Sequence, residues 1–214
     1  MSIICLEGAS GIGKSTTSLF LEENFNFKVI PEVNELFQRP VKESATWYFE
    51  KQVERWRLAE NASINDGNVV LDGDPMQPLW YNWIFHDLGF QPLQEVFEFY
   101  DYAIQSKKIK FPEKYFILTA SEIVLRKRKE GDKNRTRRNF ETHLKLISPQ
   151  LDYFSVMRSL NLGNVDIIQS KSVSSTAASI ANSLPDLKQN VDQTTLLNNQ
   201  REFVQEYNKQ INQD

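Results

Sequence analysis

LEGASGIGKST, residues 6–16, matches the pattern G-x-x-x-x-G-K-[ST] at its four specified positions, which are Gly8, Gly13, Lys14 and Ser15. Turns with this pattern point successive backbone N–H groups at a phosphate, while the lysine supplies positive charge and the serine hydroxyl a ligand for Mg²⁺. We therefore expect this loop to bind the phosphates of a nucleotide. The predicted binding residues form one continuous segment: Gly8, Ala9, Ser10, Gly11, Ile12, Gly13, Lys14, Ser15 and Thr16.

The segments around this loop predict a strand before it and a helix after it. Residues 2–6 form a short apolar run, as fully buried parallel strands do, and residues 14–23 carry apolar side chains at helical spacing. A phosphate in the loop would then lie at a helix N-terminus, where free N–H groups and the helix dipole favour an anion.

Four further apolar runs predict strands, over residues 27–31, 68–72, 114–120 and 164–170. Helical patterns separate them, most clearly over residues 45–64 and 92–108. Strands that alternate with helices predict an α/β fold, with a mostly parallel five-stranded sheet and helices on both faces.

The C-terminal segment differs in composition from the rest of the chain. After Pro185 the sequence is rich in Asn and Gln, yet an approximate apolar stripe at helical spacing continues to its end. We predict a helical tail over residues 185–214, packed on the domain or on a second subunit. A disordered tail is the alternative.

Composition limits the class of protein. The 214 residues are 40% hydrophobic and 12% aromatic, which fits one globular domain with a sizeable core. A net charge of -3 argues against nucleic acid as the main partner. The apolar runs fall short of the ~18 residues that a membrane span requires. A strand that starts at once leaves no room for a signal peptide, so we expect a cytoplasmic protein.

The cysteine and histidine residues also bear on the expected compartment and metal. Cys5 is the one cysteine, lies in the first predicted strand and cannot form a disulfide within the chain, which fits a reducing compartment. The histidines are His86 and His143, and neither is near a cysteine, so structural zinc is not expected. The expected metal is Mg²⁺ that arrives with the nucleotide.

Two carboxylates follow predicted strands at the sheet edge where ligands bind in open α/β sheets. Asp72 ends the run VVLD and is a candidate, with Ser15, to hold Mg²⁺. Asp74 would face the same way if the strand continued. Glu32 follows the second strand, where it could accept the proton of an attacking hydroxyl, and Glu35 competes for that role.

Residues 125–141 are dense in Lys and Arg. Like charges three or four residues apart on a helix repel each other, so such density favours an anion-binding segment, and a triphosphate is such an anion. A solvated basic helix face is the alternative. The four tryptophans fall between residues 47 and 83, as either a stacking surface or ordinary core.

The order of these motifs resembles the P-loop nucleoside and nucleotide kinases, particularly deoxynucleoside and thymidylate kinases, from residue 3 to about residue 184. The corresponding stretches are GASGIGKS, PEVNE, WYFEKQVERW, VVLDGD, KYFILTASEIVLRKRKEGDKNRTRR and NVDIIQSKSVSS. The resemblance implies a P-loop NTPase fold, a kinase domain over residues 1–184 and an Arg-rich lid over about residues 125–141.

The resemblance also implies roles for single residues. Glu32 corresponds to the general base, Asp72 to the acid of the third strand, and Arg126 and Arg128 to the first lid arginines. The far side of the lid corresponds to Arg135, Arg137 and Arg138. The residues predicted to carry catalysis are Lys14, Glu32, Asp72, Arg126, Arg128 and Arg135.

One position departs from the family pattern. These families usually place an arginine directly after the third-strand acid, where it meets the acceptor, and this chain has Gly73. The departure weighs against a nucleoside monophosphate, although Arg39, Arg55 or Arg57 could supply the missing charge. Gln52 and Glu54 are both candidates for reading the base of the acceptor.

The predicted function is transfer of the γ-phosphoryl group of ATP, with Mg²⁺, to a hydroxyl of a nucleoside-like molecule. An antibiotic-modifying phosphotransferase would use the same scaffold. The alternatives from other classes are a P-loop ATPase that acts as a switch or motor, and a nucleotide-binding module without catalysis. The guanine-binding motif N-K-x-D does not occur. The expected partners are a nucleotide and a small-molecule acceptor, not nucleic acid or a membrane, with a homodimer left open.

Overall fold

The computed structural model describes residues 2–132, 139–159, 164–184 and 192–211. Its centre is a parallel sheet in the spatial order β2-β3-β1-β4-β5. The strands are β1 (Ile3–Glu7), β2 (Phe27–Ile30), β3 (Asn68–Asp72), β4 (Lys114–Thr119) and β5 (Asn164–Gln169). The predicted α/β fold with a five-stranded parallel sheet is therefore confirmed, and each predicted strand is within one residue of the observed one at either end.

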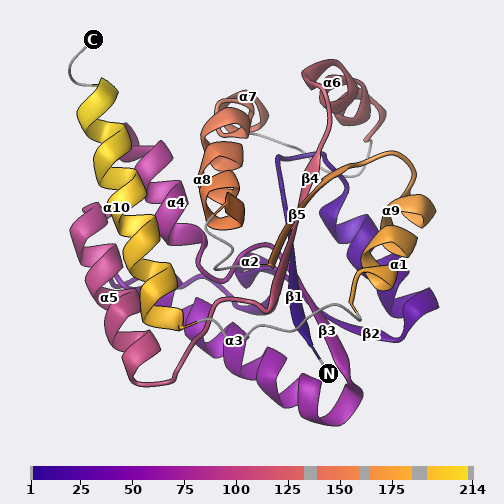
Figure 1. Ribbon diagram of the computed structural model, residues 1–214, viewed down its shortest axis with the longest axis horizontal. Coiled ribbons are helices and arrows are strands. Elements are labelled where there is room, and N and C mark those ends of the chain that lie inside the picture. Colours follow the sequence, from indigo (N-terminus) through magenta and orange to yellow (C-terminus); the bar gives the residue numbers. More distant parts are fainter. Residues whose placement is uncertain (1, 133–138, 160–163, 185–191, 212–214) are drawn as a thin grey trace.

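Helices connect the strands and surround the sheet (Figure 1). They are α1 (Lys14–Phe25), α2 (Val33–Leu36), α3 (Trp47–Asp66), α4 (Gln77–Ile84), the 3₁₀ helix η1 (His86–Leu88), α5 (Leu93–Gln105), α6 (Glu122–Gly131), α7 (Phe140–Leu144), α8 (Ile147–Ser159), α9 (Val173–Asn182) and α10 (Gln193–Ile211).

Both faces of the sheet are covered, which is why its strands read as continuous apolar runs. Side chains of β1 alternate between two hydrophobic clusters: Ile4 and Leu6 pack with Leu21 of α1 and Ile180 of α9. Cys5 belongs to the larger cluster on the opposite face, with side chains of α3, α4, α5, α8 and α10. Figure 1 shows α1 and α9 on one side of the sheet and the other long helices across from them.

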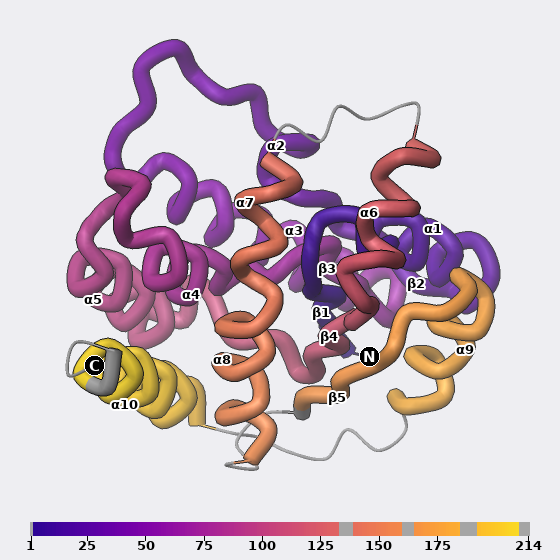
Figure 2. Tube along the Cα trace, turned by 90° about the horizontal axis from the view of Figure 1, so that it is seen from above, coloured from indigo at the N-terminus to yellow at the C-terminus, as the bar shows by residue number. Residues whose placement is uncertain are grey.

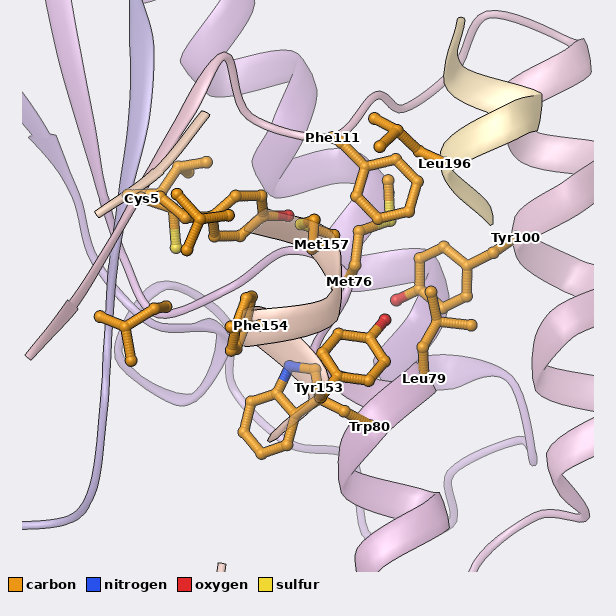
Figure 3. Close-up of a cluster of buried hydrophobic side chains, with 14 of the residues drawn as sticks. Cys5, Met76, Leu79, Trp80, Tyr100, Phe111, Tyr153, Phe154, Met157 and Leu196 are labelled. Carbon is orange, nitrogen blue, oxygen red and sulfur yellow. The ribbon is translucent and has the colours of Figure 1, made fainter. Parts of the chain in front are cut away.

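The larger cluster is rich in aromatic side chains and contains all but one of the tryptophans (Figure 3). Trp80 packs against Phe154 of α8, with ring centroids 6.4 Å apart. Phe154 also packs against Tyr115 of β4 at 5.2 Å. All four tryptophans are buried, and of these Trp80 also lines the cleft described below. The aromatic region is therefore mainly core.

Helix α10 packs against α5 and α8 of the same chain. Leu197 and Val204 on its inner face are fully buried. Trp83 Nε1 donates a hydrogen bond to Asn208 Oδ1 at 3.0 Å, and the Trp83 ring packs on Tyr207 at 5.0 Å. Residues 185–191, where the predicted kinase domain gives way to the tail, lie outside the described part of the chain, so that division stays a prediction.

Within residues 2–132, 139–159, 164–184 and 192–211, no helix has the combination of length and apolar character needed to cross a membrane. The thiol of Cys5 is buried in the core and forms no disulfide.

Candidate active site

A cleft with a volume of about 1150 Å³ opens at the carboxyl ends of the strands. Figure 2 looks down on this edge, with α7 and α8 between α4 on one side and the sheet on the other. One side of the cleft is formed by residues 8–17, α6 and the loop after β5. The other side is formed by α3, α4, the loop after β3 and the α7–α8 region. We call these the donor side and the acceptor side, after the two substrates that the sequence analysis expects.

The loop after β1 wraps closely around the end of the sheet. Gly8 has a φ of 142°, and a Cβ on it would lie only 2.5 Å from the Leu118 carbonyl oxygen of β4, so no other residue fits there. Gly13, also with positive φ, directly precedes α1. All nine residues predicted to bind phosphate line the cleft: Gly8, Ala9, Ser10, Gly11, Ile12, Gly13, Lys14, Ser15 and Thr16.

Lys14 folds back over this loop. Its Nζ donates a hydrogen bond to the Gly8 carbonyl oxygen at 2.8 Å and lies 3.8 Å from Glu7 Oε1. Burial alone would lower the pKa of the Lys14 ammonium, but the carboxylates of Glu7, Glu32 and Asp72 together hold that pKa above its usual value. The lysine is therefore charged at neutral pH and available to a phosphate.

Asp72 ends β3 and is buried, with 2% of its surface exposed. Its Oδ1 has no hydrogen-bond partner among the described residues. An orphaned carboxylate oxygen in the lining that also contains Ser15 fits a hard cation such as Mg²⁺. The described residues contain no group of three or more His, Cys, Asp or Glu that could hold a metal ion by itself.

Glu32 precedes α2 and lines the cleft, with its side chain accessible to solvent there. The surrounding protein limits its hydration, which raises the pKa of its carboxyl although the residue is not enclosed. Lys14 opposes this rise, and Asp72 and Glu7 add to it. The competing candidate, Glu35, is exposed and lies outside the cleft lining.

Asp74 would face the same way as Asp72 if β3 continued, but β3 ends at Asp72 and the Asp74 side chain is buried in the core. Its carboxylate accepts hydrogen bonds from the Met76 N–H, Trp80 Nε1 and the Tyr115 hydroxyl, each at 2.9 Å. Burial raises the pKa of Asp74 to about 7, against the effect of these bonds, and the nearby Glu7 adds to the rise. Asp74 thus fixes the loop after β3 onto the core.

Arg55 of α3 is buried beneath the acceptor side, with 1% of its surface exposed. Its Nε donates to the Pro31 carbonyl oxygen at 2.6 Å, and Nη2 donates to those of Asp72 and Gly73 at 2.8 and 3.0 Å. The guanidinium therefore joins the ends of β2 and β3. From the sequence, Arg55 was only a candidate to supply charge to the acceptor. Its carbonyl partners could not be predicted, because they become neighbours only through tertiary contacts.

The two candidates for reading the acceptor lie in different surroundings on α3. Gln52 is buried and lines the cleft, where its Oε1 accepts a hydrogen bond from Arg55 Nη1 at 3.2 Å. Glu54 lies outside the lining and pairs with Lys51 at 2.6 Å. Of the two candidates, Gln52 is therefore the one that lines the cleft.

Further polar groups on the acceptor side come from the predicted helix α3 and from α4 and α7, which the sequence did not predict. The Tyr48 hydroxyl donates to Gln77 Oε1 of α4 at 2.7 Å. Tyr81 of α4 and His143 of α7 are joined by a 3.3 Å hydrogen bond between the hydroxyl and Nε2. Burial, and then the charge of Lys14, lower the pKa of His143, which keeps it neutral at pH 7.

The predicted lid arginines have different placements. Arg128 lines the cleft and donates to the Ile12 carbonyl oxygen at 2.7 Å and to that of Ser170 at 3.1 Å. Arg126 is exposed outside the cleft and forms a bidentate pair with Glu141, at 2.8 and 2.9 Å. The remaining three, Arg135, Arg137 and Arg138, lie outside the described residues.

Comparison with solved structures identifies this architecture. A structure of deoxyadenosine kinase from M. mycoides, with products dCMP and a flexible dCDP bound, matches with a TM-score of 0.55 at 16% identity, over 87% of this chain and 100% of that one. The fold is that of the P-loop nucleoside and nucleotide kinases. A second structure of the M. mycoides enzyme, with bound dATP, matches this P-loop kinase fold with a TM-score of 0.56 at 14% identity, over 86% and 100% of the two chains.

Thymidylate kinase from Ehrlichia chaffeensis matches the same P-loop kinase fold, with a TM-score of 0.55 at 14% identity over 86% of this chain and 98% of that one. No protein-family model and no curated protein sequence matches the chain. At these identities the likeness establishes the fold, and the chemistry has to be argued from this chain's own residues.

Proposed function

We propose that this protein is a kinase that transfers the γ-phosphoryl group of ATP to a hydroxyl of a nucleoside-like small molecule. The observation that carries the proposal is that one cleft is lined both by the loop with the G-x-x-x-x-G-K-[ST] pattern and by the Glu32 carboxylate. Lys14 and Glu32 lie close enough for each to shift the pKa of the other. The cleft volume of about 1150 Å³ exceeds that of most pockets for one drug-sized ligand, which suits two substrates.

The roles follow from charge and position. Lys14 and the N–H groups of the loop bind the β- and γ-phosphates, and Ser15 and Asp72 are the residues that would hold Mg²⁺. When bound, Mg²⁺ neutralises negative charge on the phosphate oxygens. Glu32 accepts the proton of the attacking hydroxyl, for which a raised pKa is an advantage near neutral pH. Arg128 orders the donor side by joining Ile12 to the loop after β5.

Charge on the acceptor side favours an uncharged acceptor over a nucleoside monophosphate. Gly73 brings no cation to the cleft, and Arg55 is engaged by carbonyl oxygens. Arg39 lines the cleft and pairs with Glu43 at 2.7 Å. Among the described residues, this leaves the acceptor side without a free cation to bind a phosphate. Arg57 lies outside the lining.

A panel of acceptors tests the proposal. Purified protein is incubated with ATP, Mg²⁺ and, in turn, neutral nucleosides, their 5′-monophosphates and hydroxyl-bearing antibiotics, and ADP release and product mass are measured. We expect ADP release together with a phosphorylated neutral nucleoside. Phosphorylation of an antibiotic alone would reassign the acceptor. ADP release without any phosphorylated product would make the protein an ATPase, and Lys14→Ala is the control for contaminating activity.

A further inference from the structure

Glu7 is the last residue of β1, the central strand, and directly precedes Gly8. Its side chain is only 6% exposed and lies in the lining of the cleft, under the phosphate-binding loop. A carboxylate this deeply buried is unfavourable unless its oxygens are paired and hydrogen-bonded. The roles assigned above leave Glu7 without a function, so its contacts call for an explanation.

Each carboxylate oxygen of Glu7 holds a different loop. Oε1 accepts a hydrogen bond from the Gly8 N–H at 2.7 Å and lies 3.8 Å from Lys14 Nζ. Oε2 accepts a hydrogen bond from the N–H of Asp74, 67 residues away in the sequence, at 2.9 Å. One side chain thereby ties the phosphate-binding loop on the donor side to the loop after β3 on the acceptor side.

The second of these loops lies directly against Glu32. A Cβ on Gly73 would be 3.8 Å from Glu7 Oε2 and 3.6 Å from Glu32 Oε1, so both carboxylates border the space beside the Gly73 Cα. The charge of Glu7 acts on the titratable groups of Cys5 in β1, Lys14 in α1, Glu32 before α2, Tyr48 in α3 and Asp74 in the loop after β3. Arg55 and Asp72 act on Cys5 and Glu32 in the same region.

We propose that Glu7 is a positioning residue, which holds the phosphate-binding loop and the loop of residues 73 and 74 in one fixed arrangement, so that donor and base face each other across the cleft. The expected effect of Glu7 on phosphoryl transfer rests on the proposed kinase function, whereas its two hydrogen bonds do not depend on that function. Phosphoryl transfer needs reacting atoms about 3–3.5 Å apart and aligned, and a shift of about 1 Å costs about 10²-fold in rate.

The first test measures the two hydrogen bonds without any substrate. Glu7→Gln keeps the size of the side chain but has one acceptor oxygen, so its NH₂ group must face one of the two N–H groups. Amide exchange followed by NMR should become about tenfold faster or more at Gly8, Asp74 or both. Glu113→Gln, an exposed glutamate just before β4 at the opposite sheet edge, is the control and should change neither amide. Unchanged protection at both amides in Glu7→Gln would overturn the proposal.

The second test separates positioning from a general loss of structure. Glu7→Gln should lower turnover by about 10²-fold, with the ATP dissociation constant nearly unchanged. In a plot of kcat/KM against pH, the fall on the acid side should also move to lower pH in this variant, because the charge of Glu7 raises the pKa of Glu32. We call this fall the acid limb. Glu7→Asp keeps the charge but is too short to reach both loops. Its turnover should therefore fall, while the acid limb of kcat/KM stays at the same pH as in the wild type.

The outcomes of the second test are distinct. A purely structural role would lower turnover of Glu7→Gln only in proportion to the folded fraction, and this result would contradict positioning. If the wild type phosphorylates no acceptor, the proposed function fails, and the amide-exchange measurement decides the role of Glu7 by itself.

Discussion

At the scale of single residues, Glu32 carries the chemical part of the proposal. Glu32→Gln removes the proton acceptor but keeps the size and polarity of the side chain, so we expect turnover to fall by about 10² to 10⁴ while ATP affinity is kept. Glu35→Gln, a glutamate outside the cleft lining, is the matched control. Steady-state kinetics and ATP titration measure both. If turnover fell in Glu35→Gln and stayed normal in Glu32→Gln, Glu35 would be the base and Glu32 would not.

The pH dependence of the wild type follows from the same carboxyl group. Glu32 acts as a base only when it is deprotonated, so kcat/KM should fall as pH decreases through its pKa. Because reduced hydration in the cleft raises that pKa, the fall should occur above the pH at which an ordinary glutamate titrates. In Glu32→Gln this acid limb should disappear.

Gly73 is the residue at which this chain departs from the pattern of the kinases that its motifs resemble. Its φ of 91° is one that L side chains rarely adopt, and Glu32 and Glu7 lie beside it. Gly73→Arg should therefore lower the free energy of unfolding by about 1–2 kcal/mol and give no activity toward nucleoside monophosphates. Urea unfolding and the acceptor panel measure the two effects. Efficient phosphorylation of a monophosphate by this variant would show that the missing arginine alone sets the acceptor.

At the scale of elements, the strands were predictable and several helices were not. Burial on both faces makes the parallel strands apolar runs, which local sequence reveals. Helix α2 has only four residues, too few to show a helical period. No helix was predicted at α4, which contains Pro78. The proline occupies the first turn of that helix, where its missing N–H costs nothing.

Helix α6 presents its two arginines to different surroundings, which yields a paired prediction. Arg128→Ala should lower turnover about 10²-fold or more, because it removes the side chain that joins the phosphate-binding loop to the loop after β5. Arg126→Ala, which breaks an exposed pair with Glu141, should have little effect. Turnover and ATP dissociation constants of both variants measure this. Equal losses in the two would mean that Arg126 also reaches the nucleotide.

At the scale of the whole molecule, α10 completes the core over α5 and α8. Leu197→Ala, at a fully buried position, should lower the free energy of unfolding by about 2–5 kcal/mol, with ATP affinity unchanged. Ile64→Ala, at an exposed position on α3, should change it by less than about 0.5 kcal/mol. Denaturant unfolding measures both. A stability that rises with protein concentration would instead place α10 on a second subunit.

The parts of the site that the sequence did not reveal depend on contacts between distant segments. The phosphate-binding loop, Asp72 and Glu32 follow strands, so their position at one sheet edge could be predicted. Glu7 lies one residue beyond the predicted strand of residues 2–6, and its partner Asp74 is 67 residues away in the sequence. The carbonyl oxygens that bind Arg55 likewise become neighbours only when the sheet forms.

The central claim is that the cleft moves a phosphoryl group from ATP to a hydroxyl. Following the label of γ-radiolabelled ATP in the presence of a neutral nucleoside that the panel identifies tests this most directly. We expect label to appear in the nucleoside in an amount equal to the ADP formed. With Lys14→Ala, we expect no label to be transferred from ATP to the nucleoside. Label released as inorganic phosphate, with the nucleoside unmodified, would contradict the claim.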